Sequence, residues 1–204
     1  MAFRDNTKSS RGLGPKSDPI FYMLALALVL LVGSVILNVA LAEKLRGANN
    51  RLSKMAAETS VAIGDALPDI EAKNLDGTSA SYSYSKDRHP TVLYVFSPSC
   101  GWCEKNFENI KALSEQKGDD YRFIGISISN KNLLEYVAKQ NLRFPVLMDP
   151  SPNTVLAYKL GGTPQTIVVS KEGKAVKNWN GAYMKNLQRD VENYFQVKLP
   201  GVQE

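Results

Sequence analysis

Residues 91–103 read TVLYVFSPSCGWC, a short apolar run that leads into the chain's only two cysteines. The apolar run is typical of a buried strand, and the polar segment 104–116 that follows it has helical spacing. A strand that feeds a helix in this way places Cys100 at the helix N-terminus, where free N–H groups and the helix dipole favour a thiolate. Cys103 lies one turn further on, close enough to attack a mixed disulfide formed by Cys100. The pattern predicts a dithiol that exchanges with disulfides.

The small number of thiols and imidazoles argues against most other uses of the pair. A closed structural zinc site needs four Cys or His ligands, whereas the chain holds two Cys and one His, His89. Covalent haem attachment needs a His directly after the second cysteine, where Glu104 stands. A purely structural disulfide across two residues would close too small a loop to constrain the unfolded chain much. We therefore expect no metal and no cofactor, and thiol–disulfide exchange as the activity.

The N-terminal region carries a 23-residue stretch without charge, residues 20–42. As a helix it would measure about 35 Å, enough to cross a hydrocarbon core of about 30 Å. A signal peptide cut after Ala42 is the alternative, because Ala40 and Ala42 fit the small-x-small cleavage pattern. Apolar cores of signal peptides are usually shorter, about 7–15 residues, so we expect an uncleaved signal anchor.

This anchor predicts a single-pass protein of the cell membrane, held in the lipid by residues 20–42. Lysines and arginines flank the span on both sides, so the positive-inside rule gives no clear orientation. The short tail 1–19 is expected to stay in the cytoplasm, and the C-terminal domain to lie on the extracytoplasmic, periplasmic side. Leucines and other apolar residues within 41–55 repeat at coiled-coil spacing, but two heptads are too few to predict a dimer. We expect a helical stalk over 43–60.

The net charge of +5 belongs mainly to the membrane-flanking part of the chain. Residues 1–60 hold 8 Lys/Arg against 4 Asp/Glu, and residues 61–204 hold 17 against 16. Basic residues beside a span suit lipid headgroups. The domain over 61–204 is almost neutral and has no basic stripe, so nucleic acid is not an expected partner.

The pattern from residue 61 onward predicts an α/β domain. Asp-Gly at 76–77 indicates a turn between two short strands, and hence an N-terminal hairpin. Strands that alternate with helices and then close in a second hairpin predict a mixed sheet with helices on both faces. The expected strands are 69–73, 78–82, 91–96, 121–127, 144–148, 166–170 and 175–179, and the expected helices are 104–116, 132–140, 154–160 and 184–195.

Several motifs in this order resemble the redoxin branch of the thioredoxin superfamily. They are Gly64-Asp65 with Pro68-Asp69, the strand with its Cys-x-x-Cys, FPVLMD at 144–149, GGTPQT at 161–166, and KEG at 171–173. With the N-terminal anchor, the chain resembles the membrane-anchored TlpA/ResA-like thiol–disulfide oxidoreductases over residues 61–195.

The resemblance implies a thioredoxin-like fold with Cys100 as the nucleophile and Cys103 as the resolving thiol. It also implies a cis peptide bond between Thr163 and Pro164, with the Thr163 backbone free to pair with a substrate beside the disulfide. Trp102, between the cysteines, would supply an aromatic face to the same substrate. The implied partners are protein thiols or disulfides and a membrane thiol-transfer electron donor. The resemblance favours a reductant in cytochrome c maturation, although the direction of electron flow is not encoded in any motif.

The chain departs from its apparent relatives at the positions of their buried acids. Tyr94 stands where thioredoxin carries an aspartate, and Asn106 stands where the ResA group carries a glutamate. Ser99 replaces the usual tryptophan before the first cysteine. We expect Glu104 and Glu108 on a solvated helix face, and His89 on the surface, so the sequence names no proton acceptor for Cys103.

Three other functions on the same fold remain as alternatives. A peroxiredoxin-like peroxidase would match a hydroxyl at Ser97, but Leu93 stands where its loop needs proline, and Cys103 crowds that loop. A copper-delivery protein would need three residues between the cysteines and a later His. A non-catalytic binding module is the third alternative. Consumption of peroxide, binding of copper and reduction of insulin would separate them.

Overall fold

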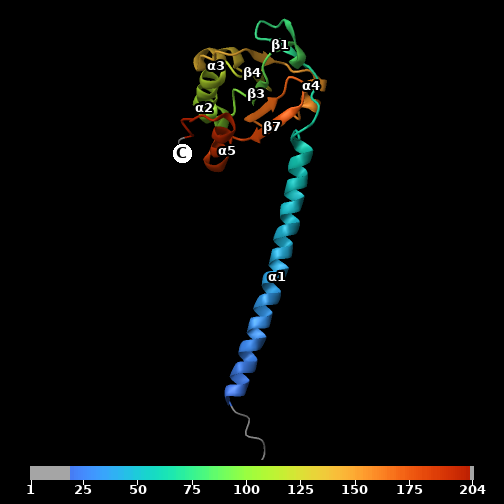
Figure 1. Ribbon diagram of the computed structural model, residues 1–204, viewed down its shortest axis with the longest axis vertical. Helices are drawn as coiled ribbons and strands as arrows, with labels where there is room; N and C mark the ends of the chain where they lie inside the picture. Colours follow the sequence, from blue (N-terminus) through green and yellow to red (C-terminus); the bar gives the residue numbers. More distant parts are fainter. Residues whose placement is uncertain (1–18, 203–204) are drawn as a thin grey trace, which may run out of the picture. The chain divides into compact units, whose positions relative to one another are not determined.

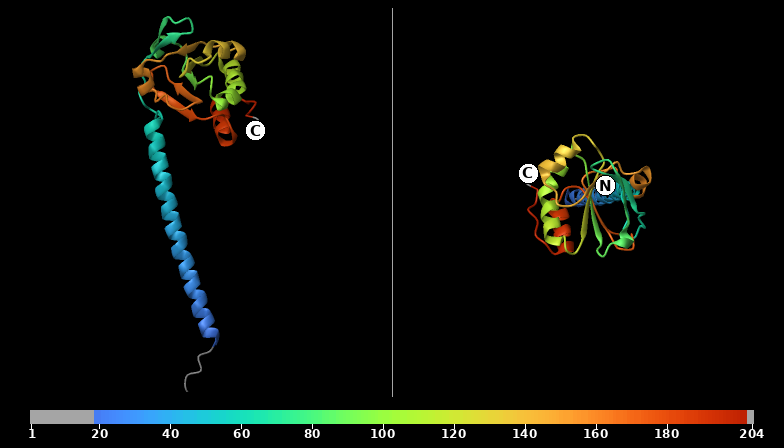
Figure 2. Two further views of the ribbon diagram at one scale, coloured as in Figure 1. Left: turned by 180° about the vertical axis from the view of Figure 1, so that it is seen from behind. Right: turned by 90° about the horizontal axis from the view of Figure 1, so that it is seen from above.

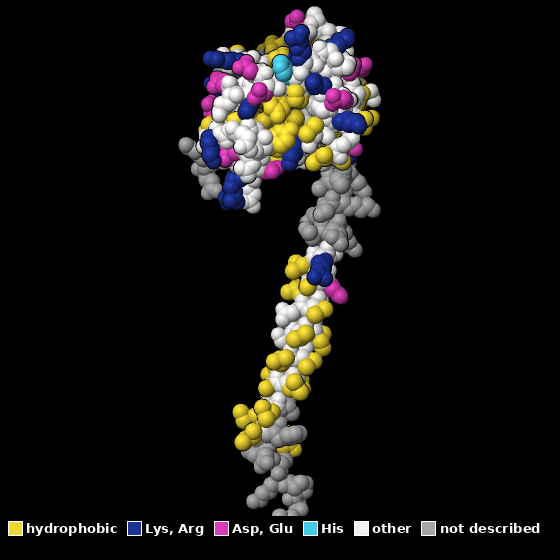
Figure 3. Space-filling view, viewed as in Figure 1, with side chains coloured by type: hydrophobic (Ala, Val, Ile, Leu, Met, Phe, Trp, Pro, Cys, Tyr) yellow, Lys and Arg dark blue, Asp and Glu magenta, His cyan; other side chains and the backbone are white. Residues whose placement is uncertain are grey.

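The protein is described by a computed structural model that covers residues 19–202 (Figure 1). It divides into two units, residues 1–53 and 54–204. The described part of the first unit belongs to one long helix, α1 (Pro19–Thr59), which continues into the second unit. Within residues 19–202, one stretch, Tyr22–Gly47, is long and apolar enough to cross a membrane. Figure 3 shows hydrophobic side chains along most of this stretch, with charged side chains only at the end nearer the second unit's sequence.

The predicted span 20–42 overlaps this stretch over most of its length. The predicted cytoplasmic tail 1–19 lies outside the described residues except for Pro19. Helix α1 runs without interruption to Thr59, and the stalk role of residues 43–60 stays a prediction.

The second unit is built on one seven-stranded mixed sheet with the order β2-β1-β5-β4-β3-β6-β7. The central strands β3, β4 and β5 run parallel, and each remaining neighbour pairs antiparallel. An N-terminal hairpin of β1 and β2 extends the sheet at one edge, as the Asp-Gly turn predicts. The strands are β1 (Ile70–Asn74), β2 (Ser79–Tyr82), β3 (Thr91–Phe96), β4 (Arg122–Ser127), β5 (Val146–Met148), β6 (Gln165–Val169) and β7 (Ala175–Asn180).

Helices cover both faces of the sheet (Figure 2). One face packs against α2 (Gly101–Lys117), α3 (Leu133–Gln140) and α5 (Lys185–Phe195), and the other against α4 (Pro152–Ala157) and the short 3-10 helix η1 (Tyr84–Lys86). All six residues of β3 are buried because the strand lies between the two layers. Its even-numbered side chains enter the α2 core and its apolar odd-numbered ones, Leu93 and Val95, enter the α4 core. The predicted α/β fold with helices on both faces is confirmed.

The element bounds differ from the predicted ones only at their ends. Helix α4 starts at Pro152 instead of residue 154, because the Ser151 hydroxyl accepts the Thr154 N–H and a proline fits the first turn. Helix α2 starts at Gly101, directly after the first cysteine. Strand β6 starts at Gln165, because Gln165 pairs with the central strand β3 at Val95.

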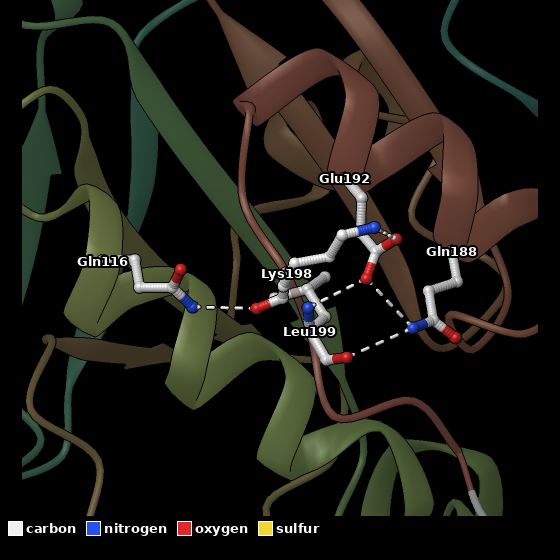
Figure 4. Close-up of polar contacts among 5 residues, drawn as sticks. All are labelled: Gln116, Gln188, Glu192, Lys198 and Leu199. Atoms are coloured by element: carbon white, nitrogen blue, oxygen red, sulfur yellow. Dashed lines mark hydrogen bonds and ion pairs between the residues drawn. The ribbon is translucent and has the colours of Figure 1, made fainter.

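After α5 the described residues 196–202 form neither helix nor strand, and we call this segment the C-terminal strap. It is held between α2 and α5 (Figure 4). From α2, the Gln116 amide donates to the Lys198 carbonyl at 3.1 Å. From α5, Glu192 accepts the Leu199 N–H at 2.9 Å, and Gln188 donates to the Leu199 carbonyl at 3.3 Å. The Leu199 N–H is the main cause of a lowered Glu192 pKa, with Gln188 and Lys198 adding to it.

Candidate active site

Cys100 lies between the end of β3 and the first turn of α2, as the sequence predicts. It is the N-cap residue of α2, and its Sγ accepts the Cys103 N–H at 3.1 Å. The two cysteines form a disulfide, with their Cα atoms 5.2 Å apart. An N-cap sulfur is bound by a backbone N–H at the positive end of the helix dipole, which stabilises a thiolate.

The two sulfurs differ in access to solvent. Cys103 is fully buried, whereas Cys100 is only partly buried. Between them Trp102 is 51% exposed, with the Lys105 ammonium 5.0 Å from its ring centre. A partner can therefore reach Cys100 beside an aromatic surface, while Cys103 is reached only from inside the protein.

The loop before β6 lies against the exposed cysteine. The Thr163–Pro164 peptide bond is cis, as the family resemblance implied. The Thr163 carbonyl oxygen lies 3.6 Å from Cys100 Sγ. An open cavity of about 640 Å³ lies along this loop, and neither Gly161 nor Gly162 has an atom within 4 Å of where a Cβ would stand. The loop that contacts Cys100 thus also borders an open cavity, whose walls include Thr163 and Pro164.

The end of α1 is fastened beside this cavity. Thr59 contributes to its wall. The Ser60 hydroxyl accepts hydrogen bonds from the Asn178 amide at 2.6 Å and the Asn180 amide at 2.9 Å, and the Ser60 carbonyl accepts one from Lys159 at 2.8 Å. No local pattern in the sequence indicates this attachment, because its partners lie about a hundred residues apart.

Below the cysteines, the two positions that lack the family's acids come together. Tyr94 and Asn106 are both fully buried. The Tyr94 hydroxyl donates a long hydrogen bond, 3.4 Å, to the carbonyl oxygen of Cys103. Burial raises the pKa of Tyr94 well above its usual value, and contact with the Asn106 amide offsets part of that rise. The sequence identified each residue as a departure, but their contact depends on the packing of α2 on β3.

The other candidate groups lie outside this buried region. Glu104 and Glu108 are exposed, and Glu104 pairs with Lys139 at 3.1 Å. His89 is exposed as well, in line with its predicted surface position. Within residues 19–202, no group of three or more His, Cys, Asp and Glu side chains is arranged to hold a metal ion.

A family model described as Redoxin matches residues 62–197, the segment that carries the sheet, the disulfide and the cis-proline loop. The chain belongs to the Redoxin family. The chain is 23% identical over 146 residues to the thiol-disulfide oxidoreductase ResA of Geobacillus thermodenitrificans, covering 70% of this chain and 82% of that one. ResA of Bacillus subtilis is 20% identical over 149 residues, covering 72% and 81%.

Solved structures show the same redoxin fold. The thioredoxin domain of a thiol-disulfide oxidoreductase from Bacteroides vulgatus superposes with a TM-score of 0.54 at 21% identity, covering 67% of this chain and 99% of that one. A secreted Mycobacterium tuberculosis disulfide oxidoreductase, described as homologous to Escherichia coli DsbE, gives 0.51 at 20% identity, covering 62% and 93%. The protein is a thiol–disulfide oxidoreductase of the ResA/DsbE type with a Cys-x-x-Cys pair.

Proposed function

We propose that this redoxin is a membrane-anchored, extracytoplasmic oxidoreductase that exchanges disulfides with protein cysteines, with Cys100 as nucleophile and Cys103 as resolving thiol. The observation that carries the proposal is the asymmetry of the pair. The partly exposed sulfur caps a helix, and the buried one lies a turn below it. Trp102, Thr163 and Pro164 form the surface that receives the partner.

The exchange follows from this asymmetry in two steps. In the reduced protein, the Cys100 thiolate attacks one sulfur of a partner disulfide, and the other partner sulfur leaves as a thiolate that takes up a proton. Cys103 then attacks Cys100 Sγ, which breaks the mixed disulfide, and its proton passes to the second departing partner thiol. The products are the Cys100–Cys103 disulfide seen here and a partner dithiol. The reverse sequence oxidises a partner.

The Thr163 carbonyl supports the placement of the partner chain. It lies beside Cys100 Sγ, so a partner strand that attacks or is attacked there would lie within reach of the Thr163 backbone. The exposed face of Trp102 would pack against the same strand. These contacts would orient a peptide with little sequence specificity, because they use backbone groups and one aromatic ring.

The proposal places residues 20–42 in the membrane, 43–60 in a stalk and 61–204 in the catalytic domain. It is supported by the apolar part of α1, which is long enough to span. A reporter that is active only after export, fused at the C-terminus, is expected to be active. Activity of a cytoplasm-only reporter would contradict the orientation. Extraction of membranes with alkali separates the anchor from a signal peptide cut after Ala42, because only an anchored chain stays with the lipid.

The covalent intermediate gives the direct test of the roles. Cys103→Ala removes the resolving thiol and leaves Cys100 able to attack, so cells expressing it should accumulate mixed disulfides that a reducing agent releases. Cys100→Ala is the matched control and should trap no partner at its buried remaining thiol. If the two variants trap the same proteins, protein thiol exchange is wrong, and peroxide consumption by the wild type becomes the next measurement.

The trapped partner also tests the pathway. The family resemblance predicts a reductant in cytochrome c maturation that receives electrons from a membrane thiol-transfer donor. An apocytochrome with a Cys-x-x-Cys-His motif among the trapped proteins would support that prediction. Trapped proteins without such a haem-binding motif would instead indicate a role in the general repair of protein disulfides.

A further inference from the structure

A buried amide lies directly below the resolving cysteine. Asn106 stands three residues after Cys103 on α2, and both side chains are fully buried. Residues three apart on a helix share a face. The Asn106 side chain therefore enters the same core as the Cys103 sulfur, together with Tyr94 from β3.

The orientation of this amide is fixed by backbone groups. The Tyr183 N–H donates to Asn106 Oδ1 at 2.8 Å, and since a backbone N–H can only donate, that atom must be the oxygen. The same oxygen accepts the Asn109 amide at 3.1 Å. Asn109 is oriented in turn by the Gly201 N–H of the C-terminal strap, which donates to its Oδ1 at 2.7 Å. Because two donors hold its oxygen, the NH2 group of Asn106 points away from Tyr183 and Asn109.

That NH2 group has no hydrogen-bond partner within the described residues 19–202. A buried donor left unpaired costs about 1–3 kcal/mol, so such groups in a well-packed core call for an explanation. Its contact with Tyr94 is close enough to lower the tyrosine's pKa, but the geometry is not that of a formed hydrogen bond. The Tyr94 hydroxyl itself makes only a long contact, 3.4 Å, with the Cys103 carbonyl. The amide donor of Asn106 is thus unused, and the Tyr94 hydroxyl is held only by this long bond to the backbone of the resolving cysteine.

We propose that Tyr94 and Asn106 act as a pair of neutral hydrogen-bond donors to the Cys103 sulfur when it becomes a thiolate, in place of any charged group. In the disulfide that sulfur is a poor acceptor, which accounts for the unpaired amide in this oxidised structure. In the resolving step Cys103 loses its proton and attacks Cys100 Sγ as a thiolate, and the second partner sulfur leaves as a thiolate that takes up a proton. The two donors stabilise the negative sulfur between those events and take no proton themselves.

The surroundings of Cys103 keep this pair uncharged. The titratable side chains in the core that holds Cys103 are three tyrosines: Tyr94 from β3, Tyr136 from α3 and Tyr183 from the loop before α5. Burial raises the pKa of each of them, to about 12 for Tyr136. The nearest carboxylate in sequence, Glu104, is exposed and paired with Lys139. Within the described residues, no acid side chain is buried with the resolving sulfur. The thiolate of Cys103 is therefore favoured by dipoles, and its stabilisation does not titrate near neutral pH.

This inference rests on the resolving role proposed for Cys103, but its test needs no partner. In the full-length protein in detergent, Cys100→Ser leaves Cys103 as the only thiol, and its ionisation is followed by the ultraviolet absorbance of the thiolate as pH rises. Tyr94→Phe and Asn106→Leu are each expected to raise the pKa of Cys103 by about one unit, since a hydrogen bond to a charged group is worth about that much.

Tyr136→Phe is the matched control. Tyr136 belongs to the same aromatic cluster, stacks on Phe96 as Tyr94 does, and also has an unpaired buried hydroxyl within the described residues. It should leave the Cys103 titration unchanged. An equal shift in the control, no shift in Tyr94→Phe, or a shift confined to one of the two donor variants would overturn the paired role. If Asn106→Leu fails to fold, an unchanged Cys103 titration in Tyr94→Phe still overturns the paired role. Failure here, with trapping by Cys103→Ala intact, would leave the proposed function standing.

Discussion

The two faces of the sheet each bury a tyrosine-centred polar pair, and the pairs differ in how completely they are bonded. On the α4 face, the Tyr84 and Tyr158 hydroxyls lie 2.6 Å apart, and Tyr158 also donates to the Pro68 carbonyl. On the α2 face, Tyr94 and Asn106 are buried as deeply, yet the amide donor has no partner among the described residues. A closed network rigidifies a core, whereas an open one keeps donor capacity for another state of the protein.

The closed pair should give the largest loss of stability. Tyr158→Phe leaves the Tyr84 hydroxyl without its acceptor and the Pro68 carbonyl without its donor, so we expect unfolding to become easier by about 3 kcal/mol. Denaturant unfolding of the domain measures this. Tyr84→Phe is the control, because it leaves the bond to Pro68 in place and should cost about 1 kcal/mol. Equal losses of stability in the two variants would show that Tyr84 does not donate to Tyr158 while Tyr158 donates to Pro68.

The second prediction concerns Asn109, whose amide helps to orient Asn106 in the open pair. Asn109→Ala removes the acceptor of the Gly201 N–H and one of the two donors that orient Asn106. We expect a loss of about 1–2 kcal/mol in stability. We also expect the pKa of Cys103, in a Cys100→Ser background, to rise by about half of the shift caused by Tyr94→Phe. A loss of stability with an unchanged thiol titration would confine Asn109 to a structural role.

The contact between Glu192 and the C-terminal strap should make the stability of the protein depend on pH. Glu192 has a pKa lowered from 4.5, mainly by the Leu199 N–H, so its contribution to stability is complete above that value and is lost as pH falls through the lowered pKa. Glu192→Gln should flatten the acid-side fall of stability, by less than the effect of Asn109→Ala at neutral pH. Unfolding midpoints measured from neutral pH down to pH about 3 test this, and an unchanged acid limb would contradict it.

The smallest effect is expected at the surface charge nearest the cysteines. Glu104 and Lys139 form an exposed ion pair, and such pairs contribute about 0–1 kcal/mol. Glu104→Gln should therefore change stability by less than about 0.5 kcal/mol and leave the Cys103 titration where it was. A clear shift of that titration would mean that a carboxylate, and not the neutral pair, controls the resolving thiol.

The sequence predicted the parts of the fold that depend on local pattern. The strand at 91–96, the cysteine pair at the start of a helix and the hairpin at Asp76-Gly77 are encoded by short stretches, so periodicity and turn residues were enough to locate them. The cis bond before Pro164 came from the family resemblance and is present. The start of α4 was missed although Ser151 and Pro152 formed a readable N-terminal signal.

The contacts that distinguish this site could not be predicted in the same way. Asn109 meets Gly201 across 92 positions, and Asn178 meets Ser60 across 118. Such contacts depend on which helix covers which face of the sheet and on the register of packing. Tyr94 and Asn106 could each be recognised as departures from related proteins, but only the packing of α2 over β3 shows that the two departures are one feature.

The C-terminal strap also constrains how this protein can change over evolutionary time. Its polar contacts with the helices are mostly made by backbone groups, the N–H groups of Leu199 and Gly201 and the carbonyls of Lys198 and Leu199. Leu199 also buries its side chain in the α2 core, and Val197 packs against that core. At position 201, φ is +83° and a Cβ would lie 3.1 Å from Gln188. Spacing is not free, because one inserted or deleted residue after α5 would move the Gly201 N–H away from Asn109. In this segment, selection acts on length as well as on composition.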